Sequence, residues 1–533
     1  MRERLSSLRL RRLHWGGRVA PVAAVVLGLI AFSLPPLLNA AGTQSDASVV
    51  GLQAAHLLRG EWSWFLWGSG YQTSVDSVVA ALAFLVLGPS PLALTLSTFA
   101  GHVALIVFAY ATVERRVGPW PAALLVSPLV FTPAPLHIYI FYPPRQAALT
   151  WMFAAIWVLD RAPAKKWPGL WLAGGAFGAG LACFADPYVL LFLPPLAVFI
   201  WLTAREDVEG AVPNRDSLKT RRVLVRTAAG FAGGLVGLVP LWFLYRSAGA
   251  SHSVYAVSGG VLSHNFKLLM EQCLPSLMST TVYFTPEMPV TQVWQAPIWF
   301  QWIQIAGAAA LVAGVALGGA AFAFRRLPLM VQRLGVFGAS VWPVTLGAFL
   351  VSLMVMDRLS ARYLNAMILT APFALTPGLC LLGARRFALA LSPYLISAGV
   401  AGWLNYGNDV NGWRMRLENG RAQDEQALMA MLRARGIHYG TSDYWVAYRF
   451  TFLARENPTV VPWQPQLDRY PPYRSAFQTQ STVAYLFDPW RSGEALAYRE
   501  AQIRNGATDF EPVFGKYRVG RYSVLILKRR SER

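Results

Sequence analysis

Charged residues are scarce in this sequence. They make up 14% of its 533 residues, whereas a typical soluble domain has about 25%. Hydrophobic residues make up 55%, tryptophan occurs 20 times, and the mean hydropathy is +0.39. A chain with so little charge is not expected to fold as a soluble globular domain. The composition is instead typical of a protein that crosses a membrane several times.

Acidic residues are the scarcer of the two charged kinds. Lys and Arg number 47 against 27 Asp and Glu, which gives a net charge of +20. An excess of this size would suit a nucleic-acid-binding protein, but the basic residues stand in short clusters between apolar runs. Such clusters are typical of the cytoplasmic loops of membrane proteins, so we exclude nucleic acid as a partner.

Cysteine is rare, and the motifs of soluble enzymes are missing. Cys183, Cys273 and Cys380 show neither Cys-x-x-Cys nor zinc-ligand spacing, so we expect no disulfide framework. The sequence has no Walker A loop, Gly-x-Ser-x-Gly, His-Glu-x-x-His or Rossmann glycine run. The glycine-rich stretches Gly174–Gly180 and Gly230–Gly237 lie inside apolar runs, where they indicate close packing of helices.

The apolar runs predict about eleven membrane-spanning helices. Several runs are shorter than the ~20 residues that a perpendicular span requires, so we expect the helices to extend beyond them. The runs are Val19–Leu38, Ser97–Thr112, Pro121–Phe131, Ala147–Leu159, Leu170–Phe184, Tyr188–Leu202, Ala228–Leu244, Ile298–Phe324, Gly335–Met356, Leu364–Leu382 and Phe387–Trp403. Val78–Leu87 is too short to count as a span.

The basic clusters predict the orientation of the chain in the membrane. They alternate with loops that have few Lys or Arg, and the basic loops are expected on the cytoplasmic side. The N-terminus is therefore predicted inside and the tail outside, in an inner (plasma) membrane. The first run could also be read as a cleaved signal peptide. The clusters are Arg2–Arg18, Arg115/Arg116, Arg161/Lys165/Lys166, Arg205–Arg226, Arg325/Arg326/Arg333 and Arg385/Arg386.

Two regions stand apart from the predicted spans. Residues 41–91 form a long first extracytoplasmic loop, rich in Trp and Tyr, where we expect short helices at the membrane interface. Residues 404–533 are more polar and predict a small extracytoplasmic α/β domain, whereas residues 1–403 form the membrane domain. In the tail, Gln423–Arg435 reads as an amphipathic helix, and three segments read as strands. These segments are Thr459–Val461, Thr482–Phe487 and Ser523–Leu527.

The first loop has the most specific pattern in the sequence. It runs from Ser45-Asp46-Ala47 through Arg59-Gly60-Glu61 to Tyr71 and Ser74-Val75-Asp76. This pattern resembles the membrane glycosyltransferases of the GT-C fold (family 39-like), in the bacterial branch related to protein O-mannosyltransferases and the lipid A aminoarabinose transferase. Arg362-Tyr363-Leu364 and the tail segment Asp443–Arg449 resemble motifs of the same branch.

The resemblance implies transfer of a sugar from a polyprenyl-phosphate donor to an acceptor glycan, lipid or protein, with inversion. By motif match, Asp46 is the general base, Asp76 the second acid of the loop, and Arg362 a ligand of the donor phosphate. Arg358 and Arg145 are further candidates for the phosphate, because arginine binds phosphate oxygens bidentately. Tyr71, Glu61, His137 and Tyr363 are candidates for substrate binding.

Simpler interpretations exist for the same residues. Asp46 and Asp76 would also suit the first turns of helices. Arg358 could pair with Asp357 at the interface, and Arg145 could extend from a helix end toward water.

The sequence also departs from the family pattern. Ala47 replaces a Glu beside the predicted base, and Gln72-Thr73 replace two glycines. A divalent metal site is therefore left open, as are two other functions: a non-catalytic protein that binds lipid-linked sugars, and a flippase or transporter. If the protein is an enzyme, Asp46, Asp76 and Arg362 should converge on one outward-facing cavity.

Overall fold

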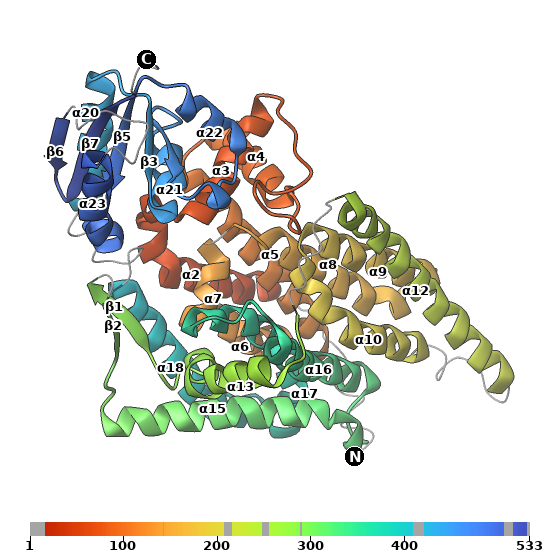
Figure 1. The fold of residues 1–533 in the computed structure, drawn as a ribbon. Coiled ribbons are helices and arrows are strands. Elements are labelled where there is room, and N and C mark those ends of the chain that lie inside the picture. The colour runs from red at the N-terminus through yellow and green to blue at the C-terminus, as the bar shows by residue number, and fades with distance from the viewer. Residues whose placement is uncertain are drawn as a thin grey trace.

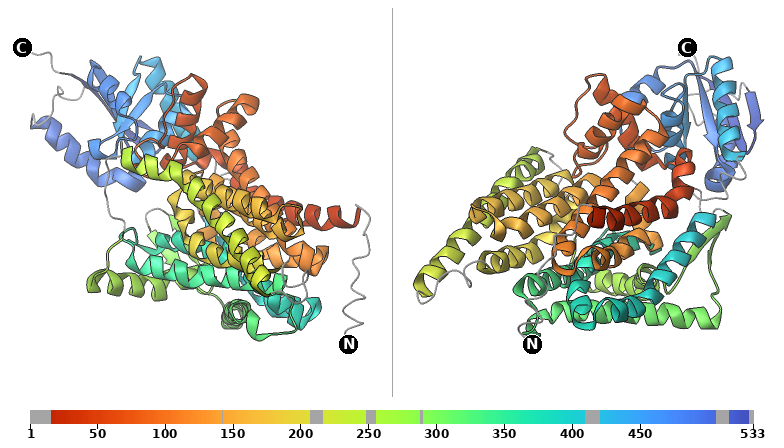
Figure 2. Two further views of the ribbon diagram at one scale, coloured as in Figure 1. Left: turned by 90° about the vertical axis from the view of Figure 1, so that its right-hand side faces the viewer. Right: turned by 180° about the vertical axis from the view of Figure 1, so that it is seen from behind.

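The computed structural model describes residues 16–141, 143–206, 216–247, 255–287, 290–408, 420–505 and 515–529. It confirms the predicted fold class: a helical membrane part, followed by a small α/β domain that lies at one end of it (Figures 1 and 2). The helices up to residue 408 are α2 (Gly16–Leu38), α3 (Ser45–Leu58), α4 (Val75–Leu87), α5 (Pro91–Val117), α6 (Pro119–Val130), α7 (Ala134–Phe141), α8 (Gln146–Arg161), α9 (Pro168–Ala185), α10 (Leu193–Glu206), α12 (Asp216–Ser247), α13 (Gly259–Leu268), α14 (Leu274–Leu277), α15 (Ile298–Gly319), α16 (Leu329–Val351), α17 (Asn365–Leu382) and α18 (Ala384–Asn408).

Shorter elements join these helices. A two-stranded antiparallel hairpin precedes α15, which the sequence did not predict. The elements are η1 (Ala40–Gly42), η2 (Ala162–Ala164), η3 (Pro187–Phe192), η4 (Leu269–Cys273), β1 (Tyr283–Glu287), β2 (Val290–Val293), η5 (Ala321–Ala323) and η6 (Arg358–Leu364).

Nine helices among the described residues are long and apolar enough to cross a membrane, and they coincide with predicted spans. The two other predicted spans, Pro121–Phe131 and Ala147–Leu159, correspond to α6 with 12 residues and α8 with 16. Both are shorter than the ~20 residues of a perpendicular span. The 13-residue α4 covers Val78–Leu87 and is also short, as predicted.

A buried ionic cluster joins the ends of four helices. Asp160 of α8 accepts hydrogen bonds from Arg116 and Arg115 of α5 and from Arg333 of α16, and Arg333 also pairs with Glu206 of α10. Each of these residues belongs to, or borders, a loop that was predicted to be cytoplasmic. The structure therefore places these loops on the same side of the molecule. Which side of the bilayer this is stays a prediction from the positive-inside rule.

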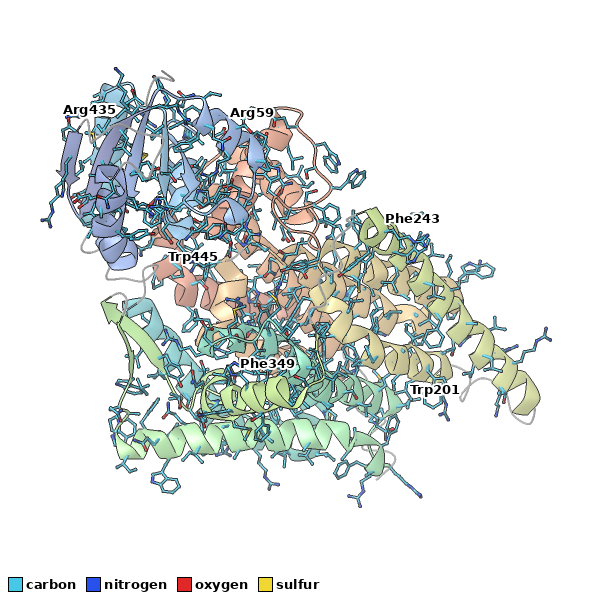
Figure 3. The ribbon with its side chains drawn as sticks, in the orientation of Figure 1. Arg59, Trp201, Phe243, Phe349, Arg435 and Trp445 are labelled. Atoms are coloured by element: carbon cyan, nitrogen blue, oxygen red, sulfur yellow. The ribbon has the colours of Figure 1, made fainter. Side chains whose placement is uncertain are left out.

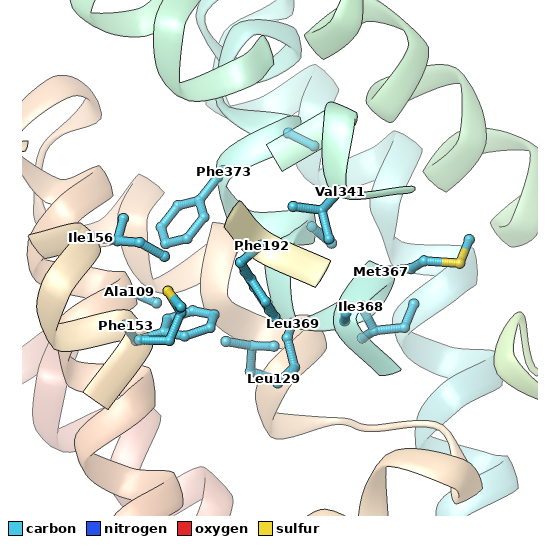
Figure 4. Close-up of a cluster of buried hydrophobic side chains, with 14 of the residues drawn as sticks. Ala109, Leu129, Phe153, Ile156, Phe192, Val341, Met367, Ile368, Leu369 and Phe373 are labelled. Carbon is cyan, nitrogen blue, oxygen red and sulfur yellow. The ribbon is translucent and has the colours of Figure 1, made fainter. Parts of the chain in front are cut away.

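The core of the membrane part surrounds α17. In the apolar 18-residue window of its candidate span, 89% of the residues are buried. Phe153 of α8, Phe192 of η3 and Phe373 of α17 pack with one another, as the close-up shows (Figure 4). The core therefore joins helices from both halves of the chain.

The C-terminal domain is built on a five-stranded sheet with the order β4-β3-β5-β7-β6. The parallel strands β3, β4 and β5 are followed by the antiparallel strands β7 and β6. The predicted amphipathic helix and the three predicted strands are confirmed as α20, β4, β5 and β7. The elements are α20 (Gly420–Ala434), β3 (Tyr439–Ser442), α21 (Tyr444–Leu453), β4 (Thr459–Pro462), η7 (Pro465–Leu467), α22 (Pro471–Gln478), β5 (Thr482–Phe487), α23 (Pro489–Arg504), β6 (Gly515–Val519) and β7 (Tyr522–Lys528).

The first loop packs against this domain. Helices α3 and α4 form a common hydrophobic cluster with α21 and the sheet, and a Cβ added at Gly51 of α3 would lie 2.7 Å from the ring of Phe452. Figure 3 shows Arg59 and Trp445 at this junction. The predicted helices of the loop are therefore present. Their position relative to the bilayer stays a prediction, as does the domain boundary after residue 403.

Close packing of α9 and α12 agrees with the glycine-rich stretches of the sequence. A Cβ added at Gly233 of α12 would overlap the backbone carbonyl of Ala173, whereas one added at Gly174 of α9 would have no atom within 4 Å. We expect Gly233→Leu to separate these helices and to lower stability by about 1–3 kcal/mol, the usual effect of overpacking. Thermal unfolding in detergent measures this. Gly174→Leu is the control, and an equal loss in both variants would contradict the packing.

Candidate functional site

The carboxylate of Asp76, which is distant in the sequence, caps the N-terminus of α8. The side chain of Asp76, in the first turn of α4, accepts hydrogen bonds from the backbone N–H groups of Arg145 and Ala147, both at 2.9 Å. Arg145 precedes α8 in a left-handed conformation with φ +91°, which is strained for a residue with a side chain. The two bonds from Asp76 hold the backbone in this conformation. Asp76, predicted as a catalytic acid, therefore has both oxygens bonded to the backbone next to Arg145.

The side chain of Arg145 points into a group of aromatic and acidic residues. Its Nε donates to Asp186 at 3.1 Å, and its guanidinium lies 5.0 Å from the ring centre of Tyr188 and 5.5 Å from that of Tyr363. Asp186 is buried and also accepts the backbone N–H of Tyr188, the second residue of η3. These contacts fix the direction of the Arg145 guanidinium.

A second arginine lies against the same tyrosine ring. Arg362 lies 5.0 Å from the ring centre of Tyr363, and its Nη2 donates to the Tyr363 hydroxyl at 3.2 Å. Both residues belong to η6, which begins with a capping box between Asp357 and Ser360. The backbone of Tyr363 is fixed as well, because its carbonyl accepts a hydrogen bond from the hydroxyl of Tyr188 at 3.2 Å. Two guanidinium groups thus share one aromatic ring, and their combined charge suits an anion.

The first loop closes this group. Tyr71 forms a side-chain hydrogen bond with Arg145, and burial raises the pKa of Tyr71, so its phenol stays protonated at neutral pH. Gln72 donates to Asp186 at 2.7 Å, and the Thr73 hydroxyl donates to the carbonyl of Ala185 at 3.1 Å. Gln72 and Thr73, two of the three residues that depart from the pattern of the resemblance, thus fasten the loop to the end of α9.

We call this group the arginine cluster. It brings together residues from the first loop, α8, α9, η3 and η6, all of which border loops predicted to be extracytoplasmic. Its members are Tyr71, Gln72, Arg145, Asp186, Tyr188, Arg362 and Tyr363.

Asp46 lies at a different contact, between the first loop and the C-terminal domain. It is in the first turn of α3, with 25% of its side chain exposed. The hydroxyl of Tyr444 donates to Asp46 Oδ1, and Nη2 of Arg469 lies 3.8 Å from the same oxygen. Burial raises the pKa of Tyr444, so its hydroxyl remains a donor. The neighbouring Ala47 is buried in the hydrophobic cluster shared with the C-terminal domain.

The remaining predicted site residues lie outside the arginine cluster. Glu61 accepts hydrogen bonds from His56 at 2.7 Å and from the Tyr470 hydroxyl at 2.9 Å. The guanidinium of Arg358 lies over the ring of Tyr283 in β1. His137 falls in α7, and its side chain lies outside the described part of the chain.

The two cavities described here do not bring Asp46, Asp76 and Arg362 together, and Arg362 lines neither of them. Asp76 lines a cavity of about 200 Å³ together with residues of α5 and α8. A second cavity of about 350 Å³ is lined by Glu61 and by Arg469, the neighbour of Asp46. Within the residues that the structure describes, no group of three or more His, Cys, Asp or Glu side chains is placed to hold a metal ion.

Sequence reasoning missed several residues of these sites. Gln72, Tyr188 and Arg469 have no local motif, and only the fold places them. Asp186 stands between the end of an apolar run and a proline. An isolated acid at such a place could have indicated a functional residue. Tyr444 begins the tail motif Asp443–Arg449, but nothing in that motif indicates its contact with Asp46.

Comparison with known proteins supports the fold. No family model and no curated protein matches the sequence. Two solved structures of ArnT from Cupriavidus metallidurans are similar, one bound to undecaprenyl phosphate and one in the apo state. Their TM-scores are 0.54 and 0.55, at 12% and 13% identity, and each match covers 95% of this chain and 98% of that chain. The predicted GT-C-like architecture is thereby confirmed.

A weaker similarity is to the oligosaccharyltransferase of Archaeoglobus fulgidus, in a complex with Zn and sulfate. The TM-score is 0.46 at 11% identity, and the match covers 90% of this chain and 69% of that chain.

Asp76 makes a testable contribution to pH dependence. Burial raises its pKa from an ordinary 3.8 to about 7, although the two backbone N–H donors act in the opposite direction. The folded state therefore binds this proton more tightly than the unfolded state, and stability falls as the pH rises from about 4 to about 7. We expect the Tm of the wild type minus the Tm of Asp76→Asn to decrease over this range and to stay constant above it. A difference that grows with pH would show that the bonds from Arg145 and Ala147 outweigh burial.

Proposed function

We propose that this protein transfers a sugar from a polyprenyl-phosphate donor to an acceptor on the extracytoplasmic side of the membrane, with inversion at the anomeric carbon. The main support is the arginine cluster, where the guanidinium groups of Arg145 and Arg362 lie 5.5 and 5.0 Å from the ring centre of Tyr363. Both arginines were predicted from the sequence as phosphate ligands. ArnT, whose fold is similar, was solved with undecaprenyl phosphate bound, which supports a lipid phosphate as a ligand.

Arg145 and Arg362 bind the donor phosphate in this proposal. Guanidinium groups donate two parallel hydrogen bonds to phosphate oxygens, and they stabilise the charge that develops on the leaving phosphate. Asp186 and Tyr188 hold Arg145 in place, and Asp76 holds its backbone. Asp76 thus acts as a positioning residue.

Asp46 accepts the proton of the acceptor hydroxyl. As the hydroxyl oxygen attacks the anomeric carbon, the bond from that carbon to the phosphate oxygen breaks, and its electron pair leaves with polyprenyl phosphate. The proton passes to the Asp46 carboxylate. The hydroxyl of Tyr444 already donates to Asp46. An acceptor hydroxyl would take the place of this donor.

Donor cleavage tests the proposal. We would purify the protein, supply undecaprenyl-phosphate-linked hexoses and pentoses with a cell-envelope extract as the source of acceptors, and measure release of undecaprenyl phosphate. We expect Arg145→Gln and Arg362→Gln to lower the rate about 10²–10³-fold through lost stabilisation of the leaving phosphate. Arg435→Gln, whose guanidinium lies over Tyr517 in the C-terminal domain, is the control and should keep the wild-type rate.

Loss of the base has its own expected size. Asp46→Asn should lower the rate of release about 10²–10⁴-fold and leave the affinity for the donor lipid unchanged. A wild-type rate in this variant would remove Asp46 from the mechanism.

A non-catalytic, donor-binding protein is the second candidate, because Ala47 stands where the family has a carboxylate and is buried in apolar surroundings. For this function, the wild type would bind undecaprenyl-phosphate sugars in an Arg145-dependent manner and would release no undecaprenyl phosphate.

A further inference from the structure

The larger cavity lies between the first loop and the C-terminal domain. Its volume of about 350 Å³ is in the range of small-molecule sites. One wall comes from residues 61–63 and 65–69 of the loop and the other from residues 469–472 of the tail. The cavity thus exists only where the C-terminal domain meets the loop, and the mechanism proposed above gives it no role.

Aromatic rings form much of the lining. Trp67 and Tyr470 stack at 4.0 Å between ring centres, with 19° between their planes, and join the two walls. Trp62 also lines the cavity, and 57% of this residue is exposed. Trp67 itself is only 8% exposed and supports Tyr470 from within the core, so the flat apolar surface comes from Trp62 and Tyr470. The C–H groups on one face of a pyranose ring pack well on such a surface.

Polar groups stand beside these rings. Glu61 and Arg469 both line the cavity, with side chains 50% and 34% exposed. The two described hydrogen bonds of the Glu61 carboxylate, from His56 and Tyr470, end on Oε2. Oε1 therefore has no partner among the described residues and is available to accept hydroxyl groups.

A buried network fixes Glu61 in this position. His56 is 5% exposed. Its Nδ1 contacts Glu61 at 2.7 Å, and its Nε2 contacts Glu456 at 2.7 Å. Glu456 in turn accepts hydrogen bonds from Arg59 and from Tyr473. The polar side of the cavity is thus held in one geometry before any ligand binds, which lowers the entropy cost of binding.

Residues that line the cavity are linked to both reactive groups of the proposed function, although neither group lines it. Ser69 lines the cavity, and Tyr71, two residues later, contacts Arg145. The Cα atoms of Ser69 and Tyr71 are therefore at most about 7 Å apart. Ser69 Oγ also accepts the backbone N–H of Gln72 at 3.0 Å. On the other wall, Arg469 reaches from the carbonyl of Gly68 to within 3.8 Å of Asp46.

We propose that this cavity is a carbohydrate subsite: it binds a sugar residue of the acceptor, with Trp62 and Tyr470 against the sugar ring and with Glu61 and Arg469 on its hydroxyl groups. The proposal rests on the function proposed above. It adds that the acceptor is a glycan, because a ring-lined cavity with one free carboxylate oxygen suits a polyol better than an acyl chain.

Sugar binding by the full-length protein in detergent tests this. We would titrate it with the methyl glycosides of glucose, mannose, galactose, arabinose and N-acetylglucosamine, and follow tryptophan fluorescence and saturation transfer to the sugar protons. We expect saturable binding of at least one glycoside, weakened at least tenfold by Trp62→Ala and by Glu61→Gln. Trp167→Ala should change the affinity less than twofold. Trp167 is the control, because it is 64% exposed and does not line the cavity, whereas Trp64 packs against the ring of Trp62 at 5.3 Å.

Two results would overturn the inference. One is that no methyl glycoside binds the wild type, or that Trp167→Ala weakens binding as much as Trp62→Ala. The other is quenching of Trp62 and Trp64 together by brominated lipids in proteoliposomes without sugar binding, which would identify the loop as a membrane anchor.

The same experiment separates this inference from the proposed function. Arg145→Gln should abolish donor cleavage and leave glycoside binding unchanged. Donor cleavage without glycoside binding would contradict the subsite. Glycoside binding without donor cleavage in the wild type would contradict the proposed transfer.

Discussion

The contact between the Arg145 guanidinium and the Tyr363 ring is the interaction on which the candidate site depends. It requires a strained left-handed backbone at Arg145, which persists because Asp76 accepts the adjacent N–H groups. It also requires Asp186 at the end of α9 and η6 after α16. Four distant segments of the chain therefore have to be in place before two arginines can share one ring.

The C-terminal domain has an equally direct part in the site. It supplies Tyr444 and Arg469 beside Asp46, and it forms one wall of the larger cavity. Buried bonds fasten it to the start of α3: Ser45 donates to the carbonyl of Tyr444, and Arg449 donates to that of Ala41 at 2.9 Å. The domain therefore belongs to the proposed transferase site and does more than cover it.

Local patterns predicted much of this structure, and the rest depends on contacts between distant segments. Apolar runs located the spans, and β-branched runs located β4, β5 and β7. The strand β3 was missed because Tyr-Gly-Thr-Ser has little strand character and is held by the neighbours on both sides. Arg145 could be singled out as a cation in a loop predicted to be extracytoplasmic, and Arg362 by its match to an Arg-Tyr motif. Their meeting on Tyr363 could not be predicted, because more than two hundred residues separate them.

The departures at Gln72 and Thr73 show the same limit. In the sequence they weaken the family pattern, whereas in the fold their side chains bond to Asp186 and to the carbonyl of Ala185. A residue that departs from a motif can thus have a structural role of its own, which becomes visible only when the fold shows the group that it bonds to.

The most direct test of the central claim is an experimental structure of the protein with undecaprenyl phosphate, determined by electron cryomicroscopy in lipid nanodiscs. Our account predicts phosphate density within hydrogen-bond distance of the guanidinium groups of both Arg145 and Arg362, beside Tyr363. Phosphate density at another place, with these two arginines still engaged only by protein groups, would contradict it.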